Sequence, residues 1–76
     1  MGVIKINCDA FVRNEMVAIV AIAREHDGLV IDGVWLRKKM DCVSLAEAEA
    51  ILLGLKLAMN RSWNKIEVES DSRVVM

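Results

Sequence analysis

The chain has 76 residues, 55% of them hydrophobic, and a formal net charge of −1 at pH 7. A chain of this length forms at most one domain, and its apolar content is that of a globular domain and too high for a disordered segment. The near-neutral charge excludes nucleic-acid binding driven by charge alone. The longest apolar run, residues 16–23, is far shorter than the roughly 20 residues of a membrane helix. The N-terminus lacks the apolar core of a signal peptide, so we expect no membrane partner and no secretion.

Three segments in the first half have strand patterns. Residues 3–9 alternate between apolar and polar side chains. Residues 16–25 begin with a continuous apolar run rich in β-branched side chains, which suits a central strand. The Asp-Gly pair at 27–28 predicts a hairpin turn. A third strand follows over residues 29–40, with Gly33 as a bulge or bend. These segments predict an antiparallel three-stranded meander.

The second half predicts a helix and a fourth strand. Ser44 and Glu47 have the S-x-x-E spacing of a capping box, and an Ala- and Leu-rich helix is predicted over residues 45–60. Residues 65–71 then alternate like a strand. A strand–helix–strand crossing usually places its strands parallel and adjacent in the sheet. Here we expect the crossover to return the fourth strand to a place beside the first. The predicted fold is therefore α/β, a mixed sheet with strands 1–3 antiparallel, strand 4 parallel to strand 1, and one main crossover helix.

Two cysteines, Cys8 and Cys42, lie far apart in the sequence and belong to neither a CxxC motif nor a zinc-ligand pattern. We expect both to be free, buried thiols, in keeping with a reducing compartment.

Carboxylates occupy the ends of the predicted elements. Asp9 ends the first strand and Asp71 ends the fourth, so both are expected at the switch point where open α/β sheets bind ligands. Glu47 lies in the first turn of the helix and begins a stripe that is expected to face the sheet. The stripe continues with Ile51, Gly54, Leu55 and Ala58.

Three converging carboxylates repel one another unless a cation lies between them. Mg²⁺ is usually held by a few carboxylates with water and substrate phosphate, and two such ions can hydrolyse a phosphodiester. The alternative is structural: Asp9 and Asp71 would each end a strand and cap the next segment of the chain, and Glu47 would complete the capping box. Spacing alone leaves both interpretations open.

The segments KINCDA, GLVIDG, AEAEAILLGLKLAM and VESDS occur in the order and approximate spacing of the type-I ribonuclease H fold. Together they resemble that family across the whole chain, and most closely the ribonuclease H-like domains of plant retroelement reverse transcriptases. The resemblance implies hydrolysis of the RNA strand of an RNA–DNA hybrid, with Mg²⁺ or Mn²⁺ held by four acidic or histidine side chains. Asp9, Glu47 and Asp71 match the first three of these positions.

The family pattern continues beyond the SDS segment with further helices, a fifth strand and the fourth metal ligand. Residues 1–76 are therefore expected to be a single partial domain, truncated at its C-terminus and weakly active or inactive in hydrolysis. An exposed sheet face is expected to lead to self-association. The alternative function is that of a non-catalytic remnant that binds nucleic acid or another protein.

Overall fold

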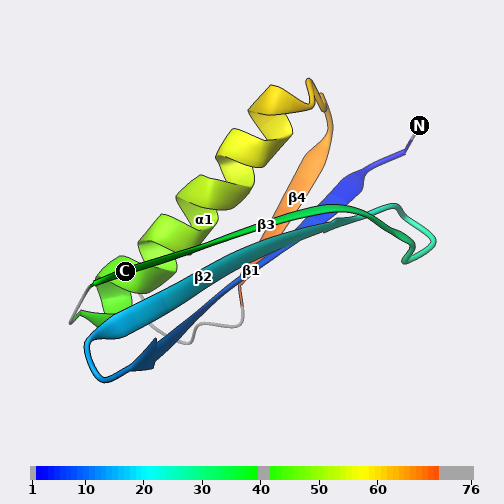
Figure 1. Cartoon of the computed structure of the whole chain (residues 1–76). Helices are drawn as coiled ribbons and strands as arrows, with labels where there is room; N and C mark the ends of the chain where they lie inside the picture. Colours follow the sequence, from blue (N-terminus) through cyan, green and yellow to red (C-terminus); the bar gives the residue numbers. More distant parts are fainter. Residues whose placement is uncertain (1, 40–41, 71–76) are drawn as a thin grey trace.

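The described part of the chain folds into a four-stranded mixed sheet with one helix on one face (Figure 1). A computed structural model describes residues 2–39 and 42–70. The elements in chain order are β1 (Ile4–Arg13), β2 (Met16–Arg24), β3 (Val30–Lys39), α1 (Val43–Asn60) and β4 (Ile66–Ser70). The strand order is β3-β2-β1-β4, with β1 antiparallel to β2, β2 antiparallel to β3, and β1 parallel to β4. The predicted fold class and the parallel placement of the fourth strand are confirmed.

The connection between β1 and β2 explains why β1 is longer than predicted. Asn14 and Glu15 both have positive φ, 50° and 63°, and they form a two-residue turn between the paired residues Arg13 and Met16. Two positive φ values are characteristic of type I′ turns, whose twist matches that of the flanking strands. Pairing with β2 therefore continues to Arg13, and the prediction that this strand ends at Asp9 is wrong.

The second hairpin has the predicted turn, with Gly28 at φ 90°. The irregularity in β3 is displaced from the predicted position. Gly33 pairs regularly with Ile22, whereas the register shifts where Ala23 pairs with Asp32 and Arg24 pairs with Val30, so that Ile31 is skipped. The bulge therefore follows the turn directly and does not coincide with the glycine.

The core lies between α1 and the face of the sheet that it covers. The largest fully buried side chains come from the strands, and the fully buried apolar side chains of the helix are alanines, which allows α1 to pack closely on β1 and β2. Ile51, Leu53 and Leu57 of α1 also pack against this core and are partly buried. The buried residues are Ile4, Ile6, Cys8, Val17, Ile19, Ala21 and Ala23 from the sheet and Ala46, Ala50 and Ala58 from α1. Within the described residues, no helix is long and apolar enough to cross a membrane.

Two features of α1 differ from the sequence prediction. The helix begins at Val43 with Cys42 as its N-cap and no side-chain capping bond, so Ser44 lies inside the first turn and the predicted capping box does not form. Cys42 is exposed, although Cys8 is buried as expected and both thiols are free. Leu55 is 39% exposed, because the stripe that packs on the sheet passes through Ala46, Ala50, Gly54 and Ala58.

Candidate functional site

Glu47 is the buried charged side chain of the core, with 9% of its surface exposed. It projects from the second turn of α1 and accepts a hydrogen bond from Ser70, with 3.3 Å between Ser70 Oγ and Glu47 Oε2. The prediction that Glu47 lies on the buried side of the helix is confirmed. Its predicted place in the first turn is wrong, because the helix begins at Val43. The bond links the start of α1 to the last residue of β4.

The pairing of β4 with β1 also places Ser70 next to β1. Cys8 and Ser70 form the last pair between β1 and β4, and they immediately precede Asp9 and Asp71 in the chain. Asp71 itself lies outside the described residues. Glu47 therefore lies beside the two strand positions that come directly before the other two candidate acids.

Asp9 lies one residue past Cys8–Ser70, the last β1–β4 pair among the described residues. Its side chain is half-buried, and its Oδ1 accepts a hydrogen bond of 2.8 Å from the backbone N–H of Ala10. Side chains alternate along a strand, so Asp9 belongs to the face opposite Cys8 and opposite the helix. Among residues 2–39 and 42–70, no group of three or more His, Cys, Asp or Glu side chains has the geometry of a metal site.

The pKa of the Cys8 thiol is affected by the nearby Glu47 carboxylate. Burial raises the pKa of the Cys8 thiol, a hydrogen bond with the backbone of Gly54 lowers it, and the negative charge of Glu47 raises it again. The Glu47 carboxylate thus acts on the buried end of the β1–β4 pair.

The donor atoms at this end of the sheet suit a hard cation. Glu47 contributes a carboxylate and Ser70 a hydroxyl, with the Asp9 carboxylate at the adjoining edge; Mg²⁺ prefers such oxygen donors, whereas zinc and copper sites favour sulfur and imidazole nitrogen. The neighbouring Cys8 is kept as a neutral thiol because burial raises its pKa. The types of donor atom present suit a Mg²⁺ or Mn²⁺ ion, although among the described residues they do not form a metal site.

Ser70 was not among the candidate residues identified from the sequence. Two features of the sequence could have identified Ser70. It directly precedes Asp71, and it lies two residues after Val68, so that Val68 and Ser70 have side chains on the same face of β4. Only the pairing register with β1 shows that this face meets Glu47.

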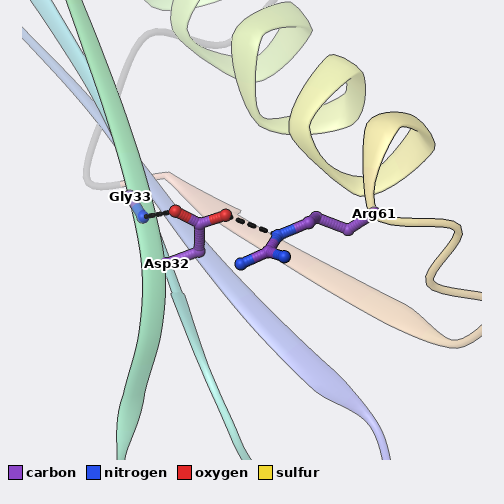
Figure 2. A network of polar contacts seen from close by, with 3 residues as sticks. All are labelled: Asp32, Gly33 and Arg61. Atoms are coloured by element: carbon purple, nitrogen blue, oxygen red, sulfur yellow. Dashed lines mark hydrogen bonds and ion pairs between the residues drawn. The ribbon is translucent and has the colours of Figure 1, made fainter.

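A second polar cluster lies at the other end of α1 and has a different role. Asp32 of β3 accepts hydrogen bonds from the backbone N–H of Gly33, at 2.8 Å, and from Arg61 Nε, at 2.6 Å (Figure 2). The Gly33 bond, followed by the Arg61 guanidinium, lowers the pKa of the Asp32 carboxyl. The Asp32 carboxylate is already paired with the Arg61 guanidinium, so this cluster links the end of α1 to β3.

Comparisons with known proteins agree with this fold. The model of the family described as reverse transcriptase-like matches residues 7–76. A crystal structure of RNase H1 from the halophilic archaeon Halobacterium salinarum superposes with a TM-score of 0.84 at 20% identity, covering 95% of this chain and 56% of the other. A structure of LC11-RNase H1 in complex with an RNA/DNA hybrid gives a TM-score of 0.78 at 21% identity, covering 92% of this chain and 55% of the other.

The chain thus spans little more than half the length of the solved structures that it matches. The search of curated proteins found no match. At these identities the structural matches show the fold, and the family model, which covers nearly all of the sequence, shows the family. The chain belongs to the reverse transcriptase-like family and has the fold of ribonuclease H.

Proposed function

We propose that this chain supplies part of a metal-dependent endonuclease that hydrolyses the RNA strand of RNA–DNA hybrids, with Asp9, Glu47 and Asp71 as metal-binding and catalytic carboxylates. The observation that carries the proposal is the buried Glu47 carboxylate beside the Cys8–Ser70 pair. Its place beside the strand ends that lead into Asp9 and Asp71 favours a role in cation binding, because Mg²⁺ is usually held by a few carboxylates with water.

The role of each residue follows from its position. Glu47 is held by the packing of α1 and by the Ser70 hydroxyl, so its oxygens have a fixed direction. Asp9 offers a second, half-buried carboxylate on β1, one residue after the Cys8–Ser70 pair. A divalent ion, when bound, neutralises these carboxylates, lowers the pKa of a water molecule and stabilises charge on the phosphate.

The 76 residues are proposed to be a partial domain, in which three of the four family acids have counterparts. Two-metal hydrolysis requires both ions to be aligned with the scissile phosphate. With one ligand lacking, we expect one ion to be weakly held and the isolated chain to hydrolyse a hybrid slowly at best.

Metal binding can be tested separately from hydrolysis. Adding Mn²⁺ to isotopically labelled chain should broaden the NMR signals of Asp9, Glu47 and Asp71, because a paramagnetic ion acts on nearby nuclei. Asp32, at the other end of α1 and already paired with Arg61, provides the matched control. Glu47→Gln should abolish the selective broadening, and Asp32→Asn should preserve it. Broadening centred on Asp32, or no broadening at millimolar Mn²⁺, would contradict the proposed metal site.

Hydrolysis of a labelled RNA–DNA hybrid is the second test. We expect the 76-residue chain to cleave slowly, with more product in Mn²⁺ than in Mg²⁺, and Asp71→Asn to reduce cleavage to the level of the buffer. Robust cleavage that survives Asp71→Asn would show that the acids are wrongly assigned. Hybrid binding without cleavage or Mn²⁺ broadening would favour the non-catalytic remnant.

A further inference from the structure

Ser70, the last residue of β4, contacts two other elements of the fold. Its backbone pairs with Cys8 of β1. Its hydroxyl donates the hydrogen bond to Glu47 of α1, with 3.3 Å between Ser70 Oγ and Glu47 Oε2. Ser70 is half-buried and Glu47 is buried. A small side chain at the end of β4 therefore reaches the carboxylate on which the proposed function depends.

The end of β4 is attached to both layers of the fold. Glu69 directly precedes Ser70, so its side chain lies on the opposite face of the sheet. There Glu69 Oε1 lies 3.8 Å from Lys5 Nζ, and Glu69 Oε2 accepts a hydrogen bond of 3.4 Å from Asn7 Nδ2. Both partners belong to β1. Glu69 thus links the end of β4 to β1, whereas Ser70 links it to α1.

The carboxylates at the two ends of α1 have chemically different partners. Asp32 is paired with the Arg61 guanidinium, which brings a positive charge. Ser70 donates a hydrogen bond to Glu47 and brings no charge. The negative charge of Glu47 acts on Cys8, where it raises the pKa of the thiol. A hydroxyl in this place can orient the carboxylate without opposing the approach of a cation.

Orientation matters because a glutamate side chain is flexible. It has three rotatable torsions, and fixing them costs rotamer entropy. The packing of α1 restrains the beginning of the Glu47 side chain, and the Ser70 hydroxyl restrains its carboxylate. A group that is already ordered loses less freedom when it binds, so its affinity is higher. Removal of the hydrogen-bond partner of a metal ligand typically lowers metal affinity by about 10–100-fold.

From these observations we propose that Ser70 is a positioning residue, whose hydroxyl orients the Glu47 carboxylate and thereby raises its affinity for a divalent cation. The inference rests on the proposed function, because it takes Glu47 as a metal ligand. Ser70 acts through Glu47 and is not itself assigned as a ligand. Loss of its hydroxyl should therefore weaken cation binding while all the proposed carboxylate ligands remain.

Mn²⁺ titrations, followed by the paramagnetic broadening of the Asp9 and Glu47 NMR signals, test this role. Ser70→Ala should raise the Kd for Mn²⁺ about tenfold or more, as expected for a lost hydrogen-bond partner of a metal ligand. Ser70→Thr keeps the hydroxyl in a residue that favours strands and should keep the Kd of the unmodified chain. The matched control is Ser62→Ala, an exposed serine just beyond the other end of α1, which should leave the Kd unchanged.

Measurements without metal separate orientation from stability. Carbon-13 relaxation of the Glu47 Cγ methylene reports the motion of this side chain on the picosecond to nanosecond timescale. Ser70→Ala should increase that motion, whereas Ser70→Thr and Ser62→Ala should not. Urea denaturation of the same variants measures what the bond contributes to stability. A purely structural role would lower the urea midpoint of Ser70→Ala and leave its Kd for Mn²⁺ unchanged.

The results distinguish a failure of this inference from a failure of the proposed function. If the unmodified chain binds Mn²⁺ at Glu47 and Ser70→Ala changes neither the Kd nor the Glu47 relaxation, the role of Ser70 is overturned and the metal site stands. A change in only one of the two, or a Ser70→Thr variant that binds as weakly as Ser70→Ala, would also overturn that role. If the unmodified chain does not bind Mn²⁺, the proposed metal site is overturned, and this inference with it.

Discussion

Gly54 is the residue that sets the distance between α1 and the sheet. A Cβ atom at this position would lie 2.7 Å from Cys8 Sγ and 2.9 Å from Ile6 Cγ2, which is shorter than normal contact. The absence of a side chain thus lets the helix backbone approach β1 closely. Glu47 lies two turns earlier on the same side of α1, so this approach also brings its carboxylate to the end of the β1–β4 pair.

Gly54→Ala should destabilise the chain, although alanine favours helices over glycine by about 1 kcal/mol. Overpacking of a core typically lowers the free energy of unfolding by about 1–3 kcal/mol, so a net loss of about 1 kcal/mol is expected. Urea denaturation of Gly54→Ala, Cys8→Ala and the double variant measures this. Because Cys8→Ala removes Sγ, Gly54→Ala should lower the free energy of unfolding by less in that background. A Gly54→Ala variant that is more stable than the unmodified chain would contradict the close contact as the cause.

At the scale of elements, the two ends of α1 are fastened differently. The start of the helix is joined to β4 by the Ser70–Glu47 bond, and the end is joined to β3 by the Asp32–Arg61 pair. A further pair, Lys38 with Glu49 at 3.5 Å, also links β3 to the helix. Since β3 is the outer strand on its side of the sheet, these pairs hold it against an element that packs mainly on β1 and β2.

The Asp32–Arg61 pair predicts a specific pH dependence. The folded-state pKa of Asp32 is lowered from the ordinary value of 3.8, so its stabilisation is present above that value and is lost as the pH falls through the folded pKa. Asp32→Asn should therefore reduce the free energy of unfolding near neutral pH, and the difference from the unmodified chain should shrink in acid. Urea denaturation from pH 7 to pH 2.5 measures the difference. Glu67→Gln, an exposed carboxylate on β4, is the control, and a difference that stays constant into acid would contradict the assignment.

At the scale of the whole molecule, the described residues form a two-layer unit whose sheet is covered by α1 on one face (Figure 1). A chain of about this size buries only some 60% of its unfolded surface, so its stability is expected to be modest. Binding that is specific for the folded state adds stability by mass action. A cation bound at the proposed site would stabilise the fold in this way.

The local parts of this fold could be predicted from the sequence. Alternation in residues 3–9, the Asp-Gly turn and the Ala- and Leu-rich helix each indicate their element through backbone periodicity or turn geometry, which depend on neighbouring residues only. The tendency of strand–helix–strand crossings to place strands parallel and adjacent then predicted β4 beside β1. For the site, helical periodicity placed Glu47 on the buried side of α1, whereas Asp9 and Asp71 as metal ligands remain predictions.

The tertiary structure decided the features that depend on distant residues. β1 extends to Arg13 because β2 pairs with it along its full length. The helix starts without the Ser44 capping box, and Glu47 bonds Ser70, 23 residues away. Ser70 meets Glu47 only through the register of β4 on β1. Likewise, the fully buried apolar positions of α1 are alanines, while the larger Ile51, Leu53 and Leu57 pack against the same core and stay partly exposed. The sequence alone determined which elements form, and packing between them decided which side chains meet.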